Sequence, residues 1–335
     1  MTVTDDHVQP ADHARLCVLA SGSSGNCSVL VSQHSGRRSV CLIDLGLSPR
    51  RTSAALAKLG LWLSDVTDVL LTHLDIDHCQ PAWAAALPAD AHVHIFRGHV
   101  PEAERTGMLA RPLRVFTSDF ELSCGAEVSP LRMPHDLEGV IAFRLNWPRS
   151  SLGFATDLGR VTDGLVGHLA GVDVLAIESN YDPMMQRRAA RPEFLKRRIM
   201  GGSGHLSNAQ AAEAAQRIAP RDHVVLLHLS RQCNDPELVS RMHEGADYAF
   251  TISSHDLPTR WVNIGRPDAP RAVPDRARPV RNGRSASLRL PTDGQTEFAS
   301  QPLARIAFQA GLFPLLDGAE APLQCRPQAP GIDQA

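Results

Sequence analysis

The chain alternates short apolar runs with Gly, Ser, Asn and Pro turns from Leu16 onward, a pattern typical of strands joined by tight loops. Helical spacing of Ala and Leu behind a Ser, Asn or Asp cap predicts helices at 48–60, 208–219 and 235–245. A β-rich half therefore precedes a mixed half, with no linker between them. Apolar runs predict strands at 16–20, 27–32, 39–46, 68–71, 92–96, 112–116, 127–133, 139–147, 151–157, 173–180, 223–230 and 246–254.

The composition changes at both ends of this pattern. Residues 1–15 show no periodicity and are expected to form a flexible leader, whereas 16–264 are expected to form one domain. From 265 to 335 the chain is rich in Arg and Pro and poor in apolar residues. A disordered tail is therefore expected there, with a short helix at 303–316.

Composition and charge restrict the class of protein. Apolar residues make up 43 % and charged residues 21 % of the chain, which allows a sizeable core. The formal net charge of -2 gives no overall basicity, so nucleic acid would have to be bound locally. The seven cysteines are never spaced Cys-x-x-Cys, which favours free thiols in a reducing compartment. The N-terminus lacks signal-peptide features and no stretch approaches the ~18 apolar residues of a membrane span. We therefore expect a cytoplasmic protein with no membrane partner.

Ionisable residues follow the predicted strand at 68–71 in an unusual density. His73, Asp75, Asp77 and His78 lie within six positions. Imidazole and carboxylate are ligands for divalent cations, and burying so many polar groups at a strand end is costly without a metal. Residues 73 and 75 point the same way in an extended or turning segment, whereas 77 and 78 can face a second ion. The alternative is a solvated loop that is rich in Asp and His.

The motif His-x-Asp-x-Asp-His behind Leu-Thr resembles the His-x-His-x-Asp-His signature of the metallo-β-lactamase superfamily. The resemblance implies a four-layer αβ/βα sandwich of the α/β (α+β) class over 16–264, with two divalent metal ions. It assigns metal ligands to His73, Asp75, Asp77, His78, His135, Asp157 and His228. In this assignment His135 completes the first metal site, Asp157 bridges both metals and His228 completes the second. Asp44, at an early strand end, would support the site by hydrogen bonds.

Three segments resemble a narrower branch of that superfamily, the WalJ/YycJ-like exonucleases that act on DNA. They are LASGSSGNCSVL near the start, GHLSNAQAAEA at 204–214 and HLSRQCNDPELV at 228–239. The resemblance spans about 16–254 and implies a phosphodiesterase that acts on nucleic acid.

Asp75 is the main departure from the family pattern, because it stands where a second histidine is usual. A carboxylate adds negative charge and hardens the first site, so Mn²⁺ or Fe²⁺ should compete better with Zn²⁺ there. The expected mechanism uses a hydroxide that bridges the two metals and attacks phosphorus or a carbonyl carbon. Asp77 and His205 are the candidate catalytic residues, and His205 would protonate the leaving oxygen. Asp44 and Asp136 are candidates for orienting the ligand histidines.

Two further segments have functional and structural interpretations. Ser207 and Asn208 follow His205 at a helix start, where they would either receive a phosphate or serve as an ordinary N-cap. The basic segment 186–198 would either grip a phosphate-rich substrate or form a solvated helix face. The SGSSGN loop at 21–26 would either cradle an anion or form a plain turn.

Three functions remain open at this point. The first is a dinuclear nuclease or phosphodiesterase. The second is a hydrolase of a small thioester, lactone or cyclic nucleotide, and the third is a non-catalytic binding module on the same fold. The oligomeric state is not predicted.

Overall fold

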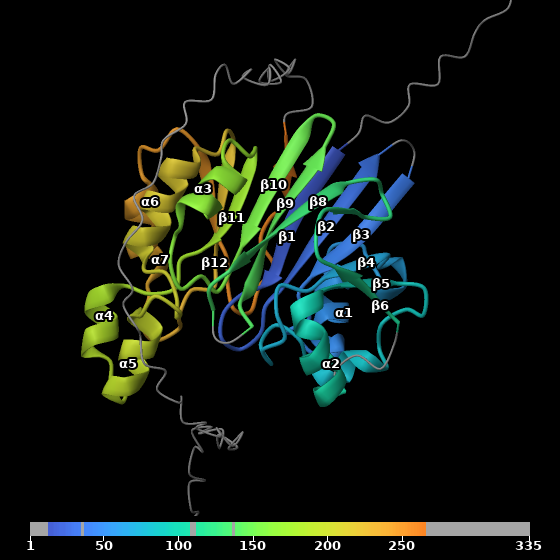
Figure 1. The fold of residues 1–335 in the computed structure, drawn as a ribbon. Helices are drawn as coiled ribbons and strands as arrows, with labels where there is room; N and C mark the ends of the chain where they lie inside the picture. The colour runs from blue at the N-terminus through green and yellow to red at the C-terminus, as the bar shows by residue number, and fades with distance from the viewer. Residues whose placement is uncertain (1–12, 35–36, 108–111, 136–137, 266–335) are drawn as a thin grey trace, which may run out of the picture. The chain divides into compact units, whose positions relative to one another are not determined.

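The computed structural model describes residues 13–34, 37–107, 112–135 and 138–265 (Figure 1). The chain divides into two units, 1–273 and 274–335, and the second lies outside the described residues. The expected tail and its helix at 303–316 therefore also lie outside them, as does most of the expected leader. The first strand begins at His13, a little earlier than the apolar pattern indicates.

The first sheet contains seven strands in the order β14-β1-β2-β3-β4-β5-β6. Strands β1 to β3 form an antiparallel meander, whereas β3, β4, β5 and β6 run parallel. The strands are β1 (His13–Ala20), β2 (Cys27–His34), β3 (Arg37–Ile43), β4 (Asp68–Leu70), β5 (His92–Phe96), β6 (Leu113–Phe116) and β14 (Val262–Ile264).

The second sheet also contains seven strands, in the order β13-β12-β11-β10-β9-β8-β7. Strands β10 to β13 run parallel, and the others pair antiparallel. The strands are β7 (Phe120–Glu121), β8 (Glu127–Met133), β9 (Val140–Trp147), β10 (Ser150–Ala155), β11 (Val174–Glu178), β12 (His223–Leu227) and β13 (Ala249–Ile252).

The helices start where the sequence gives capping signals. The side chain of Ser48 caps α1 by accepting a hydrogen bond from the backbone N–H of Arg51. The side chain of Asp235 caps α7 by accepting one from the backbone N–H of Glu237. Helix α2 is not predicted, because it is too short to show a clear period. Helices α4 and α5 overlap the basic segment 186–198, for which a helix face is one of the two interpretations. The helices are α1 (Pro49–Lys58), α2 (Val100–Thr106), α3 (Asp163–Leu169), α4 (Pro183–Arg188), α5 (Glu193–Met200), α6 (Asn208–Ile218) and α7 (Pro236–His243). No helix in the described part of the chain has both the length and the apolarity needed to cross a membrane.

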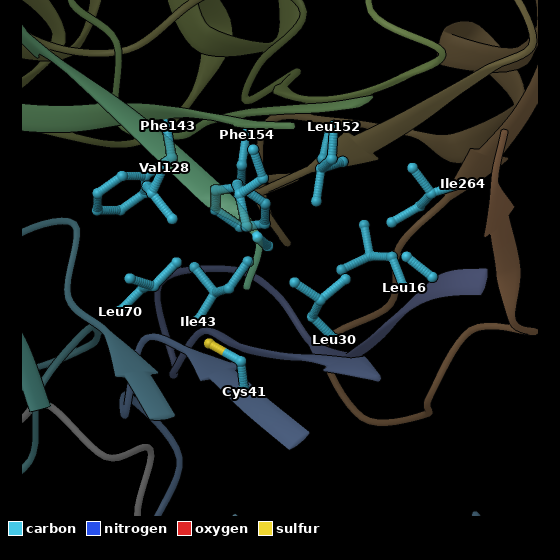
Figure 2. Packing of buried hydrophobic residues seen from close by; sticks show 14 of the residues in the cluster. Leu16, Leu30, Cys41, Ile43, Leu70, Val128, Phe143, Leu152, Phe154 and Ile264 are labelled. Carbon is cyan, nitrogen blue, oxygen red and sulfur yellow. The ribbon is translucent and has the colours of Figure 1, made fainter. Parts of the chain in front are cut away.

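Three apolar cores separate four layers. The central core joins the inner faces of the two sheets, where Leu30 and Ile43 of the first sheet face Phe143 and Phe154 of the second (Figure 2). A second core packs α1 against the outer face of the first sheet, and a third packs α3 and α6 against the outer face of the second. The predicted αβ/βα sandwich is confirmed.

The topology brings many loops to one edge of the sandwich. In a parallel sheet the carboxyl ends of neighbouring strands meet at the same edge, where ligands usually bind. Asp44 follows β3, and the 73–78 loop follows the paired strand β4. Asp157 follows β10, Glu178 ends β11 and His228 follows β12, and these three strands are adjacent and parallel. Side chains that are far apart in the sequence therefore emerge next to one another.

Candidate metal centre

The structure brings together the seven residues expected to bind metal. Their nitrogen and oxygen atoms form overlapping groups in which all atoms lie within 4.8 Å of one another. One group is His73, Asp75 and His135, and another is Asp77, His78 and His228. These two groups correspond to the first and second metal sites of the sequence analysis. Asp157 joins His73 and His78 in a third group, so it lies between the other two.

The backbone at three of the strand ends adopts the left-handed conformation. Asp44, Asp157 and His228 have φ of 63°, 51° and 54°, and Ala219 is the one further non-glycine residue with positive φ among those described. This conformation is unfavourable for residues with a Cβ, and such strain concentrates at functional sites. The chain turns abruptly at each of these three residues, and their own side chains lie at the candidate metal centre.

Asp157 is a deeply buried carboxylate of the centre, with 1 % of its surface exposed. Its Oδ2 lies 2.6 Å from His78 Nε2 and 3.6 Å from His73 Nε2, and its Oδ1 contacts His228 Nδ1. Burial by itself would raise the pKa of Asp157, but the neighbouring His228 and His78 rings outweigh burial and hold that pKa well below 3.8. The carboxylate is therefore ionised.

The 73–78 loop has a buried side and an exposed side. The rings of His73 and His78 are 5 % and 0 % exposed, whereas the side chains of Asp75 and Asp77 are 51 % and 23 % exposed. Burial and the nearby His78 ring lower the pKa of His73, which keeps it in the neutral form that binds metals. Burial would also lower the pKa of His78, but the carboxylates of Asp157 and Asp44 outweigh it and raise that pKa. Positive charge is thus favoured beside Asp157.

Asp44 contacts the 73–78 loop and the residue before it through its carboxylate. Its Oδ1 accepts hydrogen bonds from the backbone N–H and the hydroxyl of Thr72, at 2.8 and 2.9 Å. Its Oδ2 lies 2.7 Å from His78 Nδ1, so the opposite ring nitrogen of His78 faces Asp157. These contacts are the ones that the supporting role implied by the resemblance would require of Asp44.

The Ser/Gly loop at 21–26 lies against the same centre. Asn26 Nδ2 is 2.9 Å from His78 Nε2, and the hydroxyl of Ser21 accepts a hydrogen bond from the backbone N–H of His228. The backbone N–H of Gly22 donates to Asn26 Oδ1, and that of Gly25 donates to the carbonyl of Gly22. These amides are engaged within the loop, which favours the plain-turn interpretation over an anion cradle.

His205 and Glu178 form a close pair beside Asp157. His205 Nδ1 lies 2.6 Å from Glu178 Oε1 and 3.3 Å from Asp157 Oδ1. Burial would lower the pKa of His205, but the two carboxylates outweigh it and raise that pKa. Glu178 is fully buried, and its Oε2 accepts from the backbone N–H groups of Leu158 and Leu206. The sequence analysis missed Glu178, although an acidic residue that ends the apolar run VLAIE was a usable signal.

Ser207 and Asn208 lie at the start of α6, where the structure favours the N-cap interpretation. The Ser207 hydroxyl accepts from the backbone N–H of Gln210. Asn208 is fully buried and bonds through its side chain to Ser179 and Asn234. Neither residue lines the cavity described next. Asp136, the other candidate for orienting a histidine, lies outside the described residues.

A cavity of about 460 Å³ opens onto the candidate ligands. Its volume falls within the range of pockets that hold small ligands. One wall comes from the α5 region and another from the loops that carry His205 and Ser230. The residues that line it are Ser23, His73, Asp75, Asp77, His135, Asp157, Asn180, Arg191, Leu195, Arg198, Ile199, Ser203, Gly204, His205, His228 and Ser230.

The donor set fits divalent cations. Both carboxylate oxygens of Asp157 and both ring nitrogens of His228 are buried without a well-aligned hydrogen-bond partner in the described ranges. Buried polar atoms of this kind are costly unless something else satisfies them. Imidazole nitrogens and carboxylate oxygens around one bridging aspartate match the ligands of Zn²⁺ and Mn²⁺.

Comparison with known proteins agrees with this geometry. A family model described as a beta-lactamase superfamily domain matches residues 41–229, more than half of the chain. An exodeoxyribonuclease YycJ of Bacillus anthracis is 29% identical over 266 residues, which cover 72% of this chain and 96% of the relative. An exodeoxyribonuclease WalJ of Streptococcus pneumoniae is 28% identical over 264 residues, which cover 74% of this chain and 97% of the relative.

A solved structure shares the fold. The metallo-beta-lactamase fold protein YhfI of Bacillus subtilis superposes with a TM-score of 0.53 at 18% identity, over 75% of this chain and 100% of that one. The family match and the fold agree with the ligand geometry at the strand ends. The chain belongs to the β-lactamase superfamily and is a metal-dependent hydrolase of that family.

Proposed function

We propose that this protein is a phosphodiesterase that removes nucleotides from a nucleic acid strand with two bound divalent cations. The observation that carries the proposal is that Asp157 forms a further group with His73 and His78, one histidine from each candidate ligand group. Arg191 and Arg198 line the same cavity. Two cations bridged by a carboxylate suit the transfer of a phosphoryl group. The guanidinium groups add a means of holding a phosphate.

The proposed ligands divide into two sets. His73, Asp75 and His135 would hold the first cation, and Asp77, His78 and His228 the second, with Asp157 shared. When bound, the two cations would lower the pKa of a water molecule and neutralise the charge that develops on the phosphate. The relatives named as exodeoxyribonucleases support a phosphodiester substrate.

His205 is the proposed general acid. Its Nδ1 is engaged by Glu178, which leaves Nε2 for the substrate. In this role His205, with Nδ1 paired to Glu178, would carry on Nε2 the proton that the leaving oxygen needs. Transfer of that proton from Nε2 to the leaving oxygen completes the cleavage of the P–O bond. Glu178 therefore positions His205.

The test is release of nucleotides from a uniformly labelled single strand of DNA in the presence of Mn²⁺, resolved on a gel over time. The wild-type protein should shorten the strand progressively. A His73→Ala variant should lose this activity, and a Glu178→Gln variant should retain part of it with an altered pH profile. Asp90→Asn is a suitable control because Asp90 is exposed and does not line the cavity.

The same preparation distinguishes the other functions. A thioester, a lactone and a cyclic nucleotide are assayed beside the strand. Turnover of one of these small substrates with an intact strand would contradict the nuclease proposal and favour a small-molecule hydrolase. Binding of fewer than one metal per chain, with no turnover of any substrate, would favour the binding module.

A further inference from the structure

Helix α5 forms one wall of the cavity but buries none of its own residues completely. Leu195, Arg198 and Ile199 of this helix line the cavity, and Arg191 lines it from just before the helix. Figure 1 shows α4 and α5 beside each other at the lower left. A helix that contributes so little to the core and so much to the cavity has a use other than stability.

The carboxyl end of α5 is fixed to the candidate catalytic residue. The backbone N–H of His205 donates to the carbonyl of Ile199 at 2.9 Å. A Cβ on Gly204 would lie 2.1 Å from the carbonyl oxygen of Arg198 and 2.3 Å from that of Ile199, so only glycine permits this approach. The last turn of α5 is thereby held next to His205.

Phe194 stands on α5 one turn from Arg198. Its side chain is among the exposed large hydrophobic groups, with 62% of its surface accessible. Residues four apart share a face of a helix and lie about 6 Å apart. Phe194 therefore lies on the same face of α5 as Arg198, which lines the cavity. Because most of its surface is exposed, Phe194 contributes little apolar burial to the stability of the fold.

The surroundings of Phe194 are strongly basic. The segment 183–200 contains six Lys and Arg residues and a single acidic residue, Glu193. The guanidinium of Arg191 is oriented, because its Nε and Nη2 both donate to Gln232 Oε1, at 3.1 and 2.7 Å. An aromatic ring interleaved with arginines is the arrangement that binds single-stranded nucleic acid, by stacking on bases and attracting phosphates.

We propose that α5 is a guide for the unpaired strand, in which Arg198 binds a phosphate next to the scissile one and Phe194 stacks on a base further along. This inference rests on the proposed nuclease function and adds that the strand is unpaired where it passes α5. The cavity that the strand end would enter holds about 460 Å³. The strand would leave the centre along α5, from its carboxyl end toward its amino end.

The test compares a twelve-nucleotide oligo-dT with thymidine 5′-(p-nitrophenyl phosphate), a substrate too short to reach Phe194. Both are assayed with Mn²⁺ and the full-length protein. Phe194→Ala should raise the KM for the oligonucleotide roughly tenfold relative to the KM for the small substrate, since stacking stabilises a bound base by about that factor. Its kcat should change little, and Phe194→Trp should restore the wild-type KM ratio.

Arg198→Ala tests the phosphate contact through salt dependence. The slope of log(kcat/KM) against log[salt] for the oligonucleotide should become shallower by about 0.7, the value for one phosphate contact to a single strand. Two controls should leave the wild-type values in place. Trp62→Ala removes an aromatic ring that is 63% exposed and does not line the cavity, and Arg241→Ala removes an exposed charge on α7.

Each result has one interpretation. If the wild type shortens the strand and Phe194→Ala and Arg198→Ala do so with unchanged KM and salt slope, the guide role is wrong and the nuclease proposal stands. An equal rise in KM for both substrates would also overturn the guide role, because it would place Phe194 in support of the site itself. If the wild type cleaves no strand, the proposed function fails and the guide role fails with it.

Discussion

Strand β4 has buried aspartate and histidine side chains near both of its ends, and the two groups are satisfied in different ways. At its start, Asp68 accepts from the hydroxyls of Thr67 and Ser123 at 2.8 and 3.0 Å and from Ser39 at 3.2 Å. His94 Nε2 lies 3.1 Å from the same carboxylate. We call these five residues the Asp68 cluster.

Beyond the end of β4, the buried carboxylate of Asp157 lacks such partners. We call Asp157 with His78, His228, His205 and Glu178 the Asp157 cluster. Its imidazoles and carboxylates crowd together, yet both oxygens of Asp157 remain without a well-aligned donor in the described part of the chain. Composition does not distinguish the clusters, because both contain a buried Asp and His. The degree of hydrogen-bond satisfaction does, and it separates a structural polar cluster from a candidate metal centre.

The sharpest test of this comparison is Asp157→Asn. Asn tolerates the left-handed backbone at φ 51°, so the turn should remain intact. The shared ligand and its charge are lost, so kcat/KM for a phosphodiester should fall by more than about 100-fold, which is the upper range for residues that only support a ligand. Metal content, measured by elemental analysis after dialysis, should fall with it. Retention of two metals per chain would show that Asp157 is not a shared ligand.

Asp44→Asn should have the next largest effect. Asp44 also has a left-handed backbone, and its carboxylate contacts His78 Nδ1 at 2.7 Å while accepting two bonds from Thr72. Loss of the carboxylate removes the group that orients His78, so metal affinity should fall by about 10–100-fold. Isothermal titration of the metal-free protein measures this change. An unchanged affinity would mean that packing alone fixes the His78 ring.

These two aspartates also show what the sequence could predict. Asp44, the 73–78 loop, Asp157 and His228 each follow an apolar strand, so their place at one edge of parallel strands follows from the pattern. The family signature added a prediction of which of them share a metal. The four-layer fold also came from the resemblance, since the apolar pattern gives the order of strands but not their pairing.

Other parts of the site depended on contacts that no local pattern encodes. Glu178 lies inside a run that predicts a strand, and its role depends on the register that sets it beside His228. Asn208 is polar and begins a helix, but its burial against Asn234 depends on a loop 26 residues away. Helix α5 has eight residues, and only the fold shows that it lines the cavity.

Asp68→Asn tests the other end of β4. The amide would place N–H groups among hydroxyl donors and leave buried polar atoms unpaired, which should lower the free energy of unfolding by about 2 kcal/mol. Metal content should equal that of the wild type, because no residue of the Asp68 cluster belongs to a group of candidate ligands among the described residues. Urea unfolding, followed by circular dichroism, provides the measurement. Loss of metal in this variant would contradict the division into a structural and a metal-binding cluster.

The difference in unfolding free energy between wild type and Asp68→Asn should depend on pH in a defined direction. Burial would raise the pKa of Asp68, but hydrogen bonds from His94, Thr67 and Ser123 outweigh it and lower the pKa below 3.8. A carboxyl whose pKa is lower in the folded state stabilises the protein above its ordinary pKa. The difference in unfolding free energy between wild type and Asp68→Asn should therefore be constant above about pH 5 and shrink as the pH falls below 3.8. A difference that grows toward acid pH would show that the carboxylate is not the stabilised form.

The smallest effect is expected at the exposed rim of the metal centre, in Asp75→His. The Asp75 side chain is 51% exposed, so solvent screens its charge and it contributes less than the buried ligands. Replacing its hard oxygen with an imidazole nitrogen should shift competition between Mn²⁺ and Zn²⁺ toward Zn²⁺, by less than about tenfold. Equilibrium dialysis against mixed metals measures the shift without any assay of activity, and Asp90→His controls for a histidine added elsewhere on the surface. An unchanged metal ratio would place Asp75 among the solvated residues, and the first cation would then be held by His73, His135 and Asp157 alone.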